Sequence, residues 1–197
     1  MTSHTTTLDT VQPGELPYAK LGTWLFLASE VMLFGSLFSA YILLRAGSAT
    51  WPHGWQLLNI KLATLNTVFL ITSSVTMVLA YAKIQNGEIG KFRLFLALTI
   101  LLGSAFLVVK YFEYSHKFHE GHFPSTNLFY ATYFTMTGLH VLHVIGGLLV
   151  NLYFLFPGLK LYESSPEQFV GRIECSGLYW HFVDLVWIFL FPVLYLL

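Results

Sequence analysis

Long apolar segments separated by short polar ones dominate the chain. Five segments are long enough to cross a hydrocarbon core of about 30 Å as helices. They are Leu21–Leu44, Leu62–Tyr81, Phe92–Val109, Leu128–Phe156 and Gly177–Leu197. None shows the alternation of apolar and polar residues that barrel strands show, and helices satisfy the backbone within lipid. The pattern therefore predicts an all-α integral membrane bundle of five transmembrane helices, with its two ends on opposite sides of the bilayer.

Composition agrees with a membrane protein and limits the partners. Hydrophobic residues make up 55% of the chain and charged residues only 10%, which is unusual for a soluble domain. The formal net charge of zero argues against a nucleic acid partner. Residues 1–20 are predicted to form a polar N-terminal tail, and residues 21–197 a single five-helix domain. The one cysteine, Cys175, excludes an internal disulfide.

The Lys and Arg residues near the ends of the spans predict the orientation. Six lie on the side that holds the N-terminus, and they are Lys20, Lys83, Lys91, Arg93, Lys160 and Arg172. Four lie on the other side, and they are Arg45, Lys61, Lys110 and Lys117. Because positive charge concentrates on the cytoplasmic side, we expect a cytoplasmic N-terminus and a periplasmic C-terminus.

Glu30 is a carboxyl group inside the first span. It lies about nine residues into the span, roughly 13 Å below its start at about 1.5 Å per residue. Lipid cannot solvate a lone carboxylate there, so we expect Glu30 to be protonated or hydrogen-bonded to another helix. A structural hydrogen bond between helices and a proton or lipid site both remain open.

The fourth segment contains His140 and His143, three positions apart and therefore neighbours on one helical face. Two imidazoles could hold a metal or haem iron, but such a site needs further ligands. The other candidates within the spans, Glu30, His181 and Asp184, would all have to converge on it. Glycines around the two histidines favour the alternative, which is hydrogen bonding between closely packed helices.

The last segment carries Trp180, His181 and Asp184 within an apolar run, and Glu174 lies shortly before it. The spacing places Trp180 and Asp184 on one face, with His181 close beside Asp184. A carboxylate beside an imidazole can relay protons, or it can form a static pair that fixes the orientation of the ring. The spacing alone leaves both open.

The connection from Lys110 to Pro124 is the other polar concentration. It contains Glu113 and Glu120, together with three histidines at intervals of three residues, which are His116, His119 and His122. A helical segment of this kind could recruit a metal. Because it carries both charge signs next to a membrane surface, we expect instead a solvated helix end that stops before Pro124.

Taken together, these residues resemble the cytochrome c oxidase subunit III family of the haem-copper oxidases across all five spans. Residues 25–30, Leu-Phe-Leu-Ala-Ser-Glu, are similar to the family's motif around its intramembrane glutamate. Residues 113–121 are similar to its loop motif, and residues 138–143 to its paired-histidine helix. The most specific likeness is Tyr-Trp-His-Phe-Val-Asp at 179–184. Because the chain lacks two N-terminal helices of the longer members, it resembles the compact five-helix form.

The resemblance implies a non-catalytic core subunit that packs against subunit I and supports proton uptake during oxygen reduction. Haem and copper would belong to partner subunits I and II, and phospholipid would occupy a cleft between the helices of this chain. The implied location is the bacterial cytoplasmic membrane. Carried onto this sequence, the polar network or lipid cleft comprises Glu30, His140, His143, Glu174, Trp180, His181 and Asp184, and the loop motif comprises Glu113, Tyr114 and Glu120.

Two alternatives remain. A protein of the same fold could associate with nitric oxide reductase, and copurification distinguishes these partners. An independent membrane metalloenzyme that uses the histidines would carry stoichiometric metal in the isolated chain. Between electron donors, the resemblance of Glu30 and of residues 179–184 favours cytochrome c over quinol, although the donor site lies on other subunits.

Overall fold

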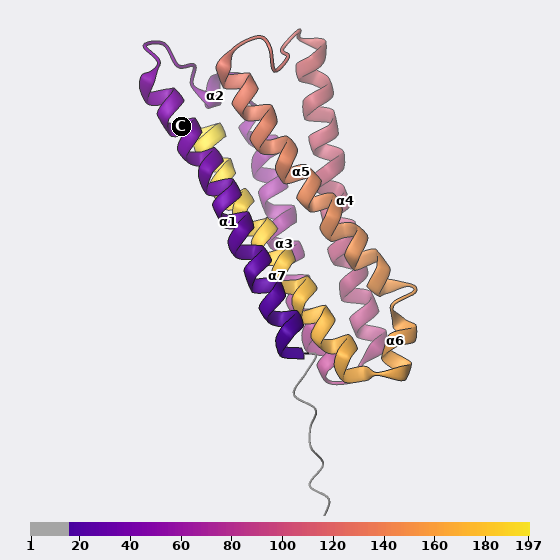
Figure 1. Ribbon diagram of the computed structural model, residues 1–197. Coiled ribbons are helices and arrows are strands. Elements are labelled where there is room, and N and C mark those ends of the chain that lie inside the picture. Colours follow the sequence, from indigo (N-terminus) through magenta and orange to yellow (C-terminus); the bar gives the residue numbers. More distant parts are fainter. Residues whose placement is uncertain (1–15) are drawn as a thin grey trace, which may run out of the picture.

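The computed structural model describes residues 16–197, and nothing is described of residues 1–15, where most of the expected polar tail lies. Helices follow one another as α1 (Leu16–Gly47), α2 (Gly54–Leu57), α3 (Ile60–Gln85), α4 (Ile89–His119), α5 (Leu128–Leu155), α6 (Leu159–Ser164), α7 (Pro166–Phe191) and the π-helical turn η1 (Pro192–Leu196). The start of α1 and the C-terminus lie at opposite ends of the bundle (Figure 1).

The predicted class is confirmed. Within residues 16–197, five helices are long and apolar enough to cross a membrane: α1, α3, α4, α5, and α7 together with η1. The connection between α1 and α3 contains the short helix α2, and the connection between α5 and α7 contains the short helix α6. At the turn between α3 and α4, Gly87 adopts a positive φ of 72°, a backbone conformation that glycine reaches without steric strain.

The helices extend beyond the apolar segments that predicted them. The fourth helix, α4, continues to His119 rather than ending near Val109, and α7 begins at Pro166, well before Gly177. Proline suits the first turn of a helix because its missing N–H needs no partner there. Beyond the first turn the missing N–H instead interrupts the helical hydrogen bonds, so the α-helical part of the last span ends at Pro192 and the chain finishes in the wider turn η1.

Asparagine side chains begin two of the transmembrane helices. The side-chain oxygen of Asn59 accepts hydrogen bonds from the backbone N–H groups of Lys61 and Leu62, at 3.1 and 3.3 Å. The side-chain oxygen of Asn127 accepts one from the N–H of Tyr130, at 2.8 Å. These caps satisfy N–H groups that the helix itself leaves free.

The central helix of the bundle is α7, which contacts α1, α3 and α5 (Figure 1). Its Trp180 is completely buried and fits between two glycines, Gly103 of α4 and Gly147 of α5. A Cβ atom added at either glycine would lie 2.8 Å from the indole ring. Small residues thus let three helices approach closely around one large aromatic side chain.

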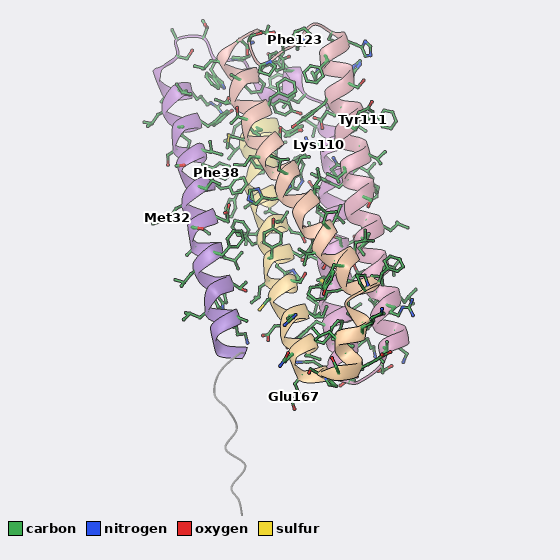
Figure 2. The ribbon with its side chains drawn as sticks, turned by 45° about the vertical axis from the view of Figure 1, so that its right-hand side comes forward. Met32, Phe38, Lys110, Tyr111, Phe123 and Glu167 are labelled. Atoms are coloured by element: carbon green, nitrogen blue, oxygen red, sulfur yellow. The ribbon has the colours of Figure 1, made fainter. Side chains whose placement is uncertain are left out.

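The first helix, α1, lies at the edge of the bundle and is the least buried of the long helices (Figure 1). It buries a narrow stripe formed by Leu27, Phe34 and Tyr41, which are spaced seven residues apart. Met32 is 78% exposed and points away from the other helices (Figure 2). This spacing is the seam expected of two helices that pack along a single line.

Candidate functional site

Glu30 and His143 form a polar contact between α1 and α5. The Glu30 carboxyl oxygen Oε2 lies 2.9 Å from His143 Nε2, and each side chain is 14% exposed. The ring of Phe34 packs edge-on against the imidazole at a centroid distance of 5.2 Å. Glu30 therefore has its hydrogen-bonding partner on another helix.

The second nitrogen of His143 constrains where the protons lie. Its Nδ1 is 2.8 Å from the carbonyl oxygen of Leu139. A carbonyl oxygen can only accept, so Nδ1 carries a hydrogen. The contact with Glu30 then requires one more proton, which either the carboxylic acid or a doubly protonated imidazole donates. In both forms the pair has no net charge, which suits a group inside a membrane.

His140 lies one turn away but has different surroundings. It is fully buried, stacks on Trp187 at 5.3 Å and packs edge-on against Phe106 at 5.6 Å. Neither of its ring nitrogens has a hydrogen-bond partner within residues 16–197. The bond between helices considered for the histidine pair is therefore made by His143, whereas His140 packs against aromatic rings.

His181 and Asp184 do not form a pair. His181 Nδ1 is hydrogen-bonded to the hydroxyl of Ser74 on α3, at 2.6 Å. Asp184 is buried, and within the described part of the chain neither of its carboxyl oxygens has a hydrogen-bond partner. The close sequence spacing predicted that the two residues are neighbours, but the hydrogen-bond partner of His181 comes from a different helix.

Trp180 and Glu174 join α7 to its neighbours at different depths. The Trp180 indole N–H donates to the hydroxyl of Ser73 on α3, at 3.0 Å. Glu174, predicted to precede the last helix, lies within α7 and forms an ion pair with Lys20 of α1, at 2.6 Å between Lys20 Nζ and the carboxylate. That ion pair is largely exposed, so it contributes little to stability.

The expectation of a solvated helix end from Lys110 onward was wrong for its first turn. Lys110 is 2% exposed, and its ammonium group donates to Glu113 at 2.9 Å and to the Tyr195 hydroxyl at 2.5 Å. It lies inside the bundle near the C-terminal end (Figure 2). Glu113 also accepts from Tyr195 at 2.6 Å and from Tyr133 at 3.0 Å. These bonds compensate for burying both charges and let α4 continue.

Tyr114 and Glu120 complete the loop motif. The Tyr114 hydroxyl is 2.6 Å from that of Thr137 on α5. Glu120 is exposed and pairs with Lys117 at 2.6 Å and His116 at 3.2 Å. The hydrogen bond from Lys117 holds the pKa of the Glu120 carboxyl below its usual range. The motif thus divides into an inward part, Glu113 and Tyr114, and a surface part.

A groove with a volume of about 650 Å³ runs between α1, α5 and α7. Phe26, Gly146 and Tyr179 line it, and the Tyr179 hydroxyl donates to the carbonyl oxygen of His143 at 2.9 Å. Phe26 is one turn from Glu30, and Gly146 is one turn from His143. The groove therefore adjoins the Glu30–His143 pair. Arg172 is also one of its lining residues.

The arrangement of side chains offers no metal centre within residues 16–197. No group of three or more His, Cys, Asp or Glu residues comes together there in a way that could hold a metal ion. His140 and His143 have separate environments, and Asp184 is hydrogen-bonded to neither of them.

Sequence reasoning missed several residues of these contacts. Tyr195 and Tyr133 stood in apolar runs without any charged neighbour, and Ser74 was one hydroxyl among many. The opposite charges of Lys110 and Glu113, three positions apart, were a usable signal of a pair on one helical face.

Comparison with known proteins agrees with the motifs. The model of the family "Cytochrome c oxidase subunit III" matches residues 3–197. The cytochrome c oxidase subunit 3 of Bacillus sp. (strain PS3) is 38% identical over 181 residues, which cover 90% of this chain and 84% of the relative. The cytochrome bo(3) ubiquinol oxidase subunit 3 of Pseudomonas putida is 34% identical over the same shares.

A further relative contains two subunits in one chain. The haem-copper oxidase subunit I+III of Aeropyrum pernix is 33% identical over 181 residues, which cover 88% of this chain and 22% of the relative. The family match over almost the whole chain, supported by relatives well above 30% identity, shows that this chain belongs to the cytochrome c oxidase subunit III family of the haem-copper oxidases.

Proposed function

We propose that this chain is the non-catalytic subunit III of a bacterial haem-copper terminal oxidase. In this role it packs against subunit I, while haem and copper are held by subunits I and II. The family match over residues 3–197 carries the proposal. The fused relative from Aeropyrum pernix supports subunit I as the neighbour, because its name joins subunits I and III. The relatives named above are oxidase subunits, which does not favour nitric oxide reductase as the partner.

The Glu30–His143 pair supports a role in proton uptake. The proton between Glu30 and His143 can move from one group to the other without a change of partner, because each group can hold it. In this proposal Glu30 and His143 form the centre of the polar network. Trp180 and Glu174 hold α7 in place beside it.

Phospholipid is the ligand that fits the groove between α1, α5 and α7. The lining is mainly apolar, as an acyl chain requires, and includes Phe26, Val150 and Phe154. Arg172 supplies a positive charge on the wall of the groove, and no carboxylate lies within ion-pair distance of it among the described residues. A guanidinium group suits a lipid phosphate.

Charge supports a cytoplasmic N-terminus in the cytoplasmic membrane. Because Lys110 is buried and paired with Glu113, it is not a loop charge. The N-terminal side then has six Lys and Arg residues, and the other side has three rather than four. The correction strengthens the bias toward this orientation.

Affinity purification of the tagged chain from native membranes tests the assignment. In mild detergent, we expect haem-copper subunits I and II to copurify and the reduced-minus-oxidised spectrum to show haem. Copurification with nitric oxide reductase would support the alternative partner. A chain isolated without partners but with stoichiometric metal would overturn the proposal in favour of an independent metalloenzyme.

Deletion of the chain tests the supporting role. We expect the remaining complex to begin oxygen consumption at nearly the normal rate and to lose activity earlier during turnover. Complete loss of activity in an otherwise assembled complex would contradict a supporting role.

A further inference from the structure

One imidazole reaches the outer surface of the bundle within the membrane-spanning part of α7. His181 is half-buried and belongs to the central helix, α7. It lies 15 residues after Pro166, about 22 Å from the start of the helix at about 1.5 Å per residue. Ser74, its partner, lies similarly deep within α3.

His181 has one nitrogen satisfied and one free. Nδ1 is bonded to Ser74 at 2.6 Å, whereas Nε2 has no hydrogen-bond partner within residues 16–197 and is not enclosed by them. Whichever tautomer is present, Nε2 needs a donor or an acceptor from outside the chain. Lipid acyl chains offer neither.

Exposed apolar side chains flank the pair along both helices. Ile71 and Val78 flank Ser74 along α3, and Leu185 and Ile188 follow His181 at helical spacing along α7. All four are about half exposed. We call these six residues the His181 face. It is apolar apart from one hydrogen-bonding position at its centre, the pattern that associating transmembrane helices use.

We infer that the His181 face docks a transmembrane helix of subunit I, and that a side chain of that helix hydrogen-bonds to Nε2 of His181. The inference rests on the proposed function and adds the surface through which the partner binds. Subunit I is chosen because the fused relative from Aeropyrum pernix joins subunits I and III. A second copy of this chain is the competing occupant.

Photocrosslinking within the intact complex tests the surface directly. A photoreactive amino acid replaces Leu185, which is 50% exposed on the His181 face, in the tagged full chain. The matched control replaces Leu101, which is 62% exposed on the side of α4 that faces away from the bundle. We expect an adduct of this chain with subunit I from position 185 and none from position 101.

The outcomes separate this inference from the proposed function. If haem-copper subunits copurify with the unmodified chain but position 185 gives no adduct with subunit I, the docking surface is wrong and the function stands. An adduct with a second copy of this chain likewise overturns the docking surface. If no haem-copper subunit copurifies at all, the proposed function fails first.

Variants of His181 test the hydrogen bond. We expect His181→Leu to weaken retention of subunit I in detergent by about threefold to thirtyfold, the range for one interhelical hydrogen bond in a membrane. His181→Gln retains a polar amide and should restore part of the retention. His119→Leu, at the exposed end of α4, is the control. Equal retention in the His181→Leu and His119→Leu proteins, both with normal thermal stability, would overturn the assignment of Nε2.

Discussion

Glu30 on α1 and His143 on α5 share one proton across 2.9 Å. The Leu139 carbonyl fixes a hydrogen on the other nitrogen of His143, so the pair is neutral with either group protonated. The two titratable side chains therefore lie within the spans as a pair that has no net charge. Each depends on the other, since removing one partner leaves a buried group without its hydrogen bond.

The protonated form of Glu30 can be trapped chemically. A hydrophobic carbodiimide reacts with carboxylic acids in apolar surroundings, so we expect it to label Glu30 at neutral pH. Glu30→Gln should abolish the labelling, which mass spectrometry of the peptide reports. The Gln amide can still donate to His143, so the variant should stay folded. Equal labelling of the variant would place the reactive carboxyl elsewhere.

Loss of one hydroxyl should destabilise the buried charges near the C-terminus. Tyr195 accepts from Lys110 and donates to Glu113, at 2.5 and 2.6 Å. Tyr195→Phe removes both bonds, and we expect the free energy of unfolding to fall by about 1–3 kcal/mol. Thermal unfolding in detergent measures it. Tyr111→Phe is the control, because that ring is exposed on α4; equal shifts in both variants would contradict the role of the cluster.

A methyl group should be harmful at Gly147 and harmless at Gly138 of the same helix. At Gly147 the new Cβ would lie 2.8 Å from the Trp180 ring, whereas nothing lies within 4 Å at Gly138. Trp180 cannot retreat because Gly103 holds its other side. We expect Gly147→Ala to lower the free energy of unfolding by about 1–3 kcal/mol. Thermal unfolding of the two variants in parallel checks this, and a tolerated Gly147→Ala would contradict the close packing.

The surface end of α4 should lose an ion pair at low pH. The hydrogen bond from Lys117 lowers the pKa of Glu120, so the pair's contribution is present at neutral pH and disappears as pH falls through that lowered pKa. Because Glu120 is 38% exposed, the contribution is at most about 1 kcal/mol. We expect the difference in thermal midpoint between the natural chain and Lys117→Met to shrink as the pH falls below the usual range of a glutamate pKa. A difference that persists at low pH would rule out the ion pair as its cause.

The corrections to the sequence-based predictions share one cause. Lys110 was expected to be solvated, and Asp184 was expected to lie close beside His181. In both cases the deciding partner, Tyr195 or Ser74, is far away along the chain. Periodicity places a residue on a face of its own helix, but it does not say which side chain of another helix meets that face.

The sequence by itself determined the class of the protein and its spans. A lipid environment forces every apolar run of sufficient length into a helix, because only a helix satisfies its backbone internally. The polar motifs of the first, fourth and last spans were enough to identify the family, because such residues are rare inside membranes.

Only the tertiary structure decided which polar groups meet. It paired Glu30 with His143, left His140 among aromatic rings and enclosed Lys110 with Glu113. It also turned His181 toward the surface. These choices depend on the relative rotation and depth of helices that are distant in sequence. Close packing sets that geometry, above all around Trp180 between Gly103 and Gly147.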